Sequence, residues 1–146
     1  MTLRNLSLLF ISLFILAACG GGGGGGGSTT PPTAGCSPST TNLCITVVGG
    51  KYVVQNSSSA GVSQKTLTLN AGTYTFDQTD SSNVTAAGAY GSARIHQIGF
   101  STTSDGTFGG GSTYSTGVNT SGSPGSTGKT TIVIDASTPS TLYYYC

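Results

Sequence analysis

The chain carries very little charge. Five Lys and Arg residues stand against four Asp residues, there is no Glu, and the formal net charge is +1 over 146 residues. Proteins that bind nucleic acid hold the phosphates with clustered Lys and Arg and release counterions as they do so. No such basic cluster occurs here, so we expect no nucleic-acid partner.

Titratable side chains suited to catalysis are equally scarce. His96 is the single histidine, and paired acid–base work needs two well-placed titratable groups. A Ser-His-Asp triad would have to use His96, and no G-x-S-x-G motif marks a serine as its nucleophile. We therefore expect that the protein is not an enzyme.

The only long apolar run lies at the N-terminus. Residues 1–18 have one positive charge, at Arg4, followed by the stretch LSLLFISLFILAA, which is too short for a permanent membrane span and is typical of a secretory leader. The run Leu16-Ala17-Ala18-Cys19 resembles a bacterial lipobox. That resemblance implies that Cys19 carries lipid and anchors the protein in the cell envelope, with Gly20 favouring the outer membrane. The alternative is an ordinary signal peptide that contains a cysteine.

Residues 19–35 have the composition of a tether. Eight glycines run from Gly20 to Gly27, followed by STTPPTAG, and such a segment has maximal backbone freedom and cannot bury apolar surface. As a flexible coil it extends roughly 20–25 Å. We place one domain at residues 36–146, beyond the tether.

Export would bring the chain into a compartment that permits disulfides. Cys36 and Cys44 bracket the short segment SPSTTNL, and we expect them to pair. With Cys19 lipidated, Cys146 is the third cysteine. Its thiol is then expected to be a disulfide partner, a metal ligand or a reactive group at risk of unwanted oxidation.

From Leu43 onward the apolar residues recur with a period of two, and no segment keeps a period of 3.6. Short β-branched and aromatic runs separated by Gly, Asn, Asp, Ser and Pro predict an all-β domain, a Greek-key β-sandwich or small barrel. The predicted strands lie near residues 43–48, 51–55, 66–69, 73–76, 94–100, 130–135 and 141–146. Residues 57–64 and 81–92 are expected to be loops, and the long segment 101–130 is expected to contain a short strand around residues 114–118.

Strict alternation has a chemical consequence. In the strand predicted at residues 94–100 it places His96 on the same face as Ile98 and Phe100. In the strand predicted at residues 141–146 it places Cys146 on the same face as Tyr144. An imidazole and a thiolate on the inner face of a β-sandwich make half of a soft copper site. The simpler alternative is a histidine packed at the rim of the core.

The stretch from about residue 45 to 146 resembles the cupredoxin-like domains of the plastocyanin and azurin type. The resemblance is carried by TLTLNAGTYTFDQTDSSN, by a His followed by GFSTTSDGT, and by the closing TLYYYC. It implies a cupredoxin-type fold, a type 1 copper site with His96 and Cys146 as ligands, and electron transfer with a redox protein partner.

The chain departs from this family at its end. The family pattern continues Cys-x-x-His-x-x-Met-Gly, whereas this sequence ends at Cys146, and Met1 is its only methionine. Gln97 also replaces the Pro that often follows the first ligand. We expect the domain to be C-terminally incomplete, with copper binding and electron transfer in its complete form. The alternative is a scaffold that has lost its metal and serves as a non-catalytic module of the cell envelope or surface.

Overall fold

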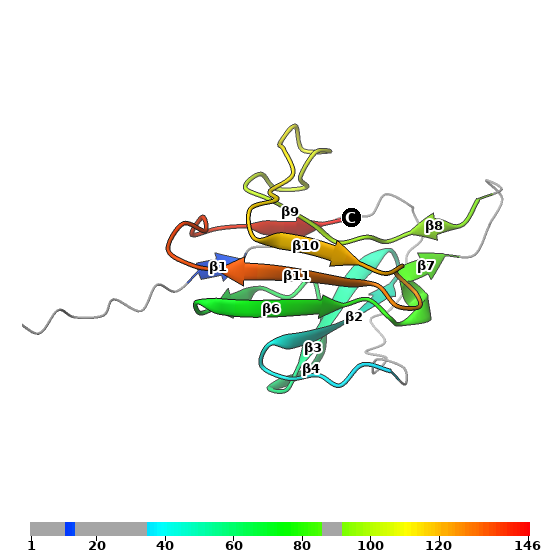
Figure 1. Cartoon of the computed structure of the whole chain (residues 1–146). Helices are drawn as coiled ribbons and strands as arrows, with labels where there is room; N and C mark the ends of the chain where they lie inside the picture. Colours follow the sequence, from blue (N-terminus) through cyan, green and yellow to red (C-terminus); the bar gives the residue numbers. More distant parts are fainter. Residues whose placement is uncertain (1–10, 14–34, 86–91) are drawn as a thin grey trace, which may run out of the picture.

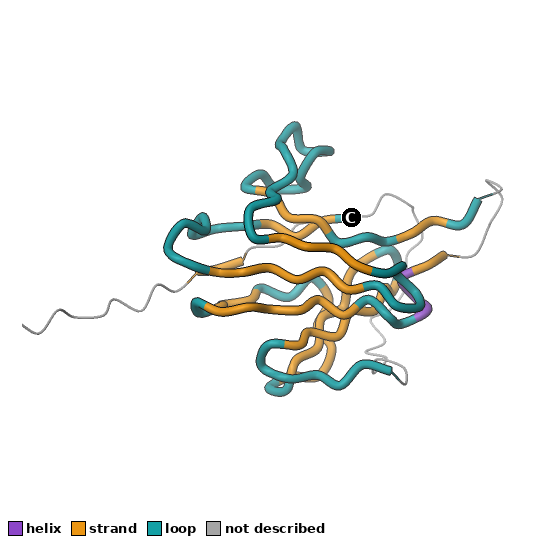
Figure 2. Tube along the Cα trace, in the orientation of Figure 1, coloured by secondary structure: helices purple, strands orange, loops and turns teal. Residues whose placement is uncertain are grey.

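A computed structural model describes residues 11–13, 35–85 and 92–146. Within these residues the fold is all-β, and one short 3₁₀-helix, η1 (Ser81–Asn83), is the only helical element (Figure 2). No helix in this part of the chain has the length and apolar character needed to cross a membrane. The expected tether and lipidation site, and all of the expected leader except residues 11–13, lie outside the described residues.

A six-stranded mixed sheet forms the larger layer (Figure 1). Its strand order is β10-β11-β6-β2-β3-β4, and every neighbouring pair is antiparallel except β2 and β6, which run parallel. The strands are β2 (Asn42–Val48), β3 (Lys51–Asn56), β4 (Ser59–Ser63), β6 (Gly72–Asp77), β10 (Val118–Ser121) and β11 (Lys129–Ile134).

Three two-stranded sheets complete the described fold. All three are antiparallel. They pair β1 (Ile11–Leu13) with β5 (Leu67–Leu69), β7 (Val84–Thr85) with β8 (Arg94–Ile95), and β9 (Gly99–Ser101) with β12 (Tyr143–Tyr145). Strand β1 falls within the segment expected to be the leader.

Aromatic rings join the larger sheet to the β9–β12 pair. Phe76 of β6 makes an edge-to-face contact with Phe100 of β9, at 5.2 Å between ring centroids, and a tilted contact with Tyr144 of β12 at 6.3 Å. Tyr52 of β3 also packs on Tyr144, at 6.1 Å. All four side chains are buried, and each such pair contributes about 0.5–1.5 kcal/mol beyond the area it buries. The β9–β12 pair is therefore held across the core from the larger sheet.

The predicted strands at residues 43–48, 51–55 and 73–76 are confirmed within one or two residues. The loop expected at residues 57–64 is wrong, because β4 forms there as an edge strand paired with β3. The loop expected at residues 81–92 is wrong in its first part, which contains η1 and β7. The short strand in the long segment lies later than predicted, at Val118–Ser121.

The disulfide predicted between Cys36 and Cys44 is present. Their Cα atoms lie 5.8 Å apart. Cys44 is buried within β2, so the bond fastens the start of the described domain to a central strand. Closing a loop of this length stabilises the fold by about 2–3 kcal/mol in the chain-entropy picture.

Candidate functional site

His96 and Cys146, fifty residues apart in the sequence, meet in the structure. The Nδ1 atom of His96 lies 3.4 Å from the Sγ atom of Cys146. His96 is only 7% exposed, and Cys146 is partly buried against the hydrophobic core. The two side chains singled out from the sequence therefore occupy one shielded place.

Strand pairing explains the meeting. In the antiparallel β9–β12 pair, Tyr144 lies opposite Phe100 and Tyr145 lies opposite Gly99. Continuing that register past the end of β12 brings Cys146 alongside the residues that precede β9, where His96 lies. The side-chain alternation predicted from the sequence holds as well, since Ile98 and Phe100 are buried while Ile95 is 60% exposed.

The predicted strand through residues 94–100 is interrupted at His96. Strand β8 ends at Ile95 and β9 begins at Gly99. The buried side chain of Gln78 takes the place of a neighbouring strand here: its Nε2 donates to the carbonyl oxygen of His96, and its Oε1 accepts from the backbone N–H of Ile98 at 3.2 Å. A side-chain amide thus satisfies backbone groups that a regular ladder would have paired.

The main-chain carbonyl of a second buried residue, Asn83, bonds the backbone of His96 from the other side. The His96 N–H donates to the carbonyl oxygen of Asn83 at 2.9 Å. Asn83 ends η1, and its own Nδ2 donates to the carbonyl oxygen of Ile45 in β2 at 2.8 Å. The helix is capped by Asp80, whose side chain accepts from the backbone N–H of Ser82. His96 is therefore connected to the central strand through a short, hydrogen-bonded segment.

The imidazole ring is contacted at both nitrogens. While Nδ1 faces Cys146, Nε2 lies 2.6 Å from the hydroxyl oxygen of Thr85. Burial lowers the pKa of His96, and the positive charge of Arg94 lowers it further. Both effects disfavour the imidazolium, so the ring is held in the neutral form, which has one nitrogen lone pair available for a ligand.

The oxidation state of sulfur decides what the pair can do. Of the cysteines that the structure describes, none is a free thiol, because Cys36 pairs with Cys44 and Cys146 is also disulfide-bonded. A metal takes cysteine as the thiolate. Cys146 is therefore available as a ligand only after reduction.

The number of donors limits the kind of site. Among the described residues, no three His, Cys, Asp or Glu side chains gather as a metal site. His96 and Cys146 are two donors, and Cys19, the expected lipidation site, lies outside the described residues. Among the described residues, the pair therefore offers two donor atoms to a metal ion.

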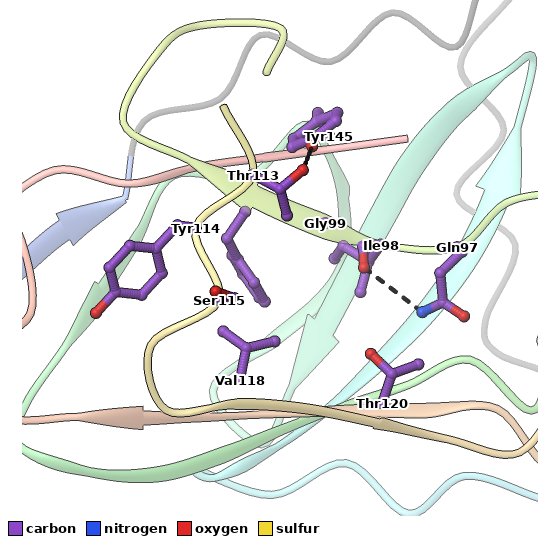
Figure 3. Close-up of a pocket in the computed structure, with 10 residues that line it drawn as sticks. Gln97, Ile98, Gly99, Thr113, Tyr114, Ser115, Val118, Thr120 and Tyr145 are labelled. Carbon is purple, nitrogen blue, oxygen red and sulfur yellow. Dashed lines mark hydrogen bonds between the residues drawn. The ribbon is translucent and has the colours of Figure 1, made fainter. Parts of the chain in front are cut away.

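A pocket of about 410 Å³ is lined by residues next to this pair in the chain (Figure 3). Gln97 and Tyr145, the chain neighbours of His96 and Cys146, line it together with residues of β9, β10 and the segment between them. The hydroxyl groups of Tyr145 and Thr113 lie 2.7 Å apart at its edge. Its lining contains no carboxylate, amine or imidazole, so the pocket offers shape and neutral hydrogen bonding rather than acid–base chemistry.

Three residues of the site had no signal of their own in the sequence. Gln78, Asn83 and Thr85 are ordinary polar residues, and Asn83 and Thr85 lie in a segment whose composition predicts a loop. Only the Asp80-Ser81-Ser82 run, a capping pattern, could have indicated the short helix that ends at Asn83. Comparison of the chain with models of protein families, with curated proteins and with solved structures gives no match. Function is therefore inferred from the chemistry of the site.

Proposed function

We propose that this protein is an exported, lipid-anchored envelope protein whose cupredoxin-like Greek-key β domain binds copper and, in its complete form, transfers electrons. The observation that carries the proposal is the 3.4 Å approach of His96 Nδ1 to Cys146 Sγ. An imidazole and a sulfur from segments fifty residues apart are brought together in a shielded place by strands packed on a common core.

The separation of the two atoms fits a shared metal ion. Metal–sulfur and metal–nitrogen bonds of about 2.3 and 2.0–2.1 Å, at trigonal or tetrahedral angles, put the two donor atoms roughly 3.5–3.8 Å apart. The observed 3.4 Å is close to that range. Thiolate and imidazole are also the donors that copper takes in electron-transfer sites, together with a second imidazole and a weak axial thioether. His96 and Cys146 supply two of these four ligands.

The surrounding residues would hold the donors in a fixed geometry. Gln78 and Asn83 bond the backbone on both sides of the His96 side chain, and the β9–β12 pairing leads directly to Cys146. Copper, when bound, would supply one-electron chemistry. A rigid donor set shielded from water lowers the reorganisation that accompanies such a transfer.

The proposal applies to the reduced protein, since Cys146 is disulfide-bonded in this structure. It is tested with Cu(I), which soft thiolates favour. A full-length chain carrying Cys19→Ala, Cys36→Ser and Cys44→Ser retains Cys146 as its one cysteine. Kept anaerobic with a non-thiol reductant, it is titrated with Cu(I) against a chelating dye.

We expect this variant to compete with the dye at about one equivalent. Adding either His96→Gln or Cys146→Ser should weaken binding by about tenfold or more, because each removes one of the two donors. Thr113→Val, which removes a hydroxyl beside the neighbouring pocket, is the matched control and should bind like its parent. Binding that is absent in the parent, or unchanged by both ligand substitutions, would overturn the copper proposal.

Anchoring is tested separately. The lipobox-like run before Cys19 supports attachment to the envelope, with the outer membrane favoured by Gly20. Cys19→Ala in an otherwise unchanged chain should move the protein from the membrane fraction to the soluble one in a bacterial host. Retention in the membrane fraction would contradict lipidation at Cys19.

The disulfide at Cys146 favours one alternative. A sulfur that stays oxidised is not a metal ligand, and the nearly neutral domain would then serve as a non-catalytic interaction module of the envelope or surface. The Cu(I) titration separates the two functions: the module predicts no binding by the reduced parent variant, and no effect of His96→Gln.

A further inference from the structure

We propose that Thr85 is the positioning residue of the site, and that its hydroxyl keeps the His96 proton on Nε2 so that the Nδ1 lone pair faces Cys146. This inference rests on the proposed function in that Nδ1 is taken as the ligand atom. It goes beyond that function by assigning a role to a residue that neither the composition nor the strand pattern marks.

The chemistry of the two contacts decides where the proton lies. A neutral imidazole has one N–H donor and one acceptor nitrogen. Nε2 faces a hydroxyl oxygen at 2.6 Å, whereas Nδ1 faces a sulfur atom at 3.4 Å. Oxygen is a good hydrogen-bond acceptor and sulfur a weak one, so the proton is better placed on Nε2, donating to Thr85. Thr85 is an exposed residue, so its hydroxyl can direct its own proton to water.

The backbone places Thr85 where this contact is enforced. Thr85 ends β7, which pairs with β8 so that Thr85 lies opposite Arg94 and Val84 opposite Ile95. One residue before β7, Asn83 accepts the backbone N–H of His96. The segment 83–85 therefore bonds both the main chain and the ring of His96, and the ring has little freedom to turn Nδ1 away from Cys146.

The effect of losing the Thr85 hydroxyl on metal affinity can be estimated. Hydrogen-bond partners of ligating histidines fix the tautomer and ring orientation, and removing one typically costs about 10–100-fold in metal affinity. Thr85→Val keeps the β-branched shape but removes the acceptor. Thr85→Ser keeps the hydroxyl and is the conservative rescue. Thr113→Val removes the hydroxyl of another exposed threonine, one that bonds Tyr145 instead, and serves as the matched control.

The first experiment needs no metal. Because His96 is the only histidine, ¹⁵N-histidine labelling of the metal-free chain, with Cys146 in its disulfide as in the structure, gives a single imidazole spin system. The unaltered chain, Thr85→Ser and Thr113→Val should show a proton on Nε2 that exchanges slowly with water. In Thr85→Val that protection should be lost. A proton on Nδ1 in the unaltered chain, or equal protection in Thr85→Val, would overturn the inference.

The second experiment measures Cu(I) affinity in the triple variant that retains only Cys146. Thr85→Val should weaken binding about 10–100-fold, with Thr85→Ser and Thr113→Val near the parent. Unchanged affinity in Thr85→Val while the parent binds Cu(I) would also overturn the positioning role. If the parent itself fails to bind, the proposed copper function fails, and the ¹⁵N spectra still decide whether Thr85 sets the tautomer. Thermal unfolding of each variant verifies that it is folded.

Discussion

The aromatic ring of Tyr145 packs directly against the backbone of Gly106. A Cβ atom at residue 106 would overlap the ring, and one at Gly99, the strand partner of Tyr145, would lie 3.2 Å from it. The ring is 7% exposed, and its hydroxyl bonds Thr113. The glycine-rich segment after β9 therefore packs against the residue that directly precedes Cys146.

Replacing Gly106 with Ala should therefore destabilise the fold by more than backbone strain alone. Gly106 and Gly110 both have positive φ, at +56° and +80°, but a Cβ at residue 110 meets no atom within 4 Å. Gly110→Ala should show only the cost of the left-handed conformation, about 1 kcal/mol. Gly106→Ala should lose a further 1–3 kcal/mol, roughly, from overpacking against Tyr145. Denaturant unfolding measures both, and equal losses would contradict the packing described.

The buried amide of Gln78 should contribute strongly to stability. It donates to His96 and Asn83 and accepts from Ile98 and Gln97. Gln78→Met leaves buried backbone groups unsatisfied, so we expect a loss of about 2–4 kcal/mol. Gln55 is the matched control, because its Oε1 is buried with no hydrogen-bond partner, and Gln55→Met should cost less than 1 kcal/mol, roughly. Urea midpoints for the two variants give the comparison, and a similar shift for both would be contrary evidence.

The network around Gln78 also shows what the sequence could and could not predict. Alternation correctly placed Ile98, Phe100 and Tyr144 in the core and set His96 and Cys146 on inward faces, since period-two burial is a local property of strands. The break in the strand after Ile95 was not predictable, because it depends on an amide contributed by a residue eighteen positions before His96. The role of Thr85 was not predictable for a similar reason. Its contact with the imidazole ring of His96 depends on how β7 and β8 pair.

Strand β4 illustrates a second limit. It spans Ser59–Ser63, with the sequence SAGVS, in which Val62 is the one residue with high strand propensity and Ala and Gly are depleted in strands. These residues form a strand because β3 offers an unpaired edge, with Val54 opposite Val62 and a register shift nearby. Pairing with an existing edge outweighs local preference, and composition alone does not report which edges are open.

The Cys36–Cys44 disulfide should stabilise the domain. The double variant Cys36→Ser, Cys44→Ser removes the bond and leaves Cys146 as it is. We expect the free energy of unfolding to fall by about 2–3 kcal/mol, because the unfolded chain loses a cross-link between residues 36 and 44. Denaturant unfolding of the variant and of the unaltered chain, both without reductant, measures the loss. Equal free energies of unfolding would contradict the prediction.

Protonation of His96 should destabilise the metal-free protein in mildly acidic solution. Burial and the charge of Arg94 lower the pKa of His96 in the folded chain, whereas in the unfolded chain it returns to about 6.5. Well above that pH neither state binds the proton, so the pKa difference has no effect. As the pH falls below about 6.5, the unfolded chain takes up the proton first, and stability decreases until the folded pKa is passed.

The measurement is denaturant unfolding of the unaltered chain and of His96→Gln between about pH 8 and pH 5, above the range in which the Asp carboxyls titrate. The unaltered chain should lose stability relative to His96→Gln as the pH is lowered. Arg94→Gln should reduce this loss but not abolish it, because burial is the larger cause of the lowered pKa. A difference between the unaltered chain and His96→Gln that stays constant with pH would mean that the folded chain accepts the proton as readily as the unfolded one.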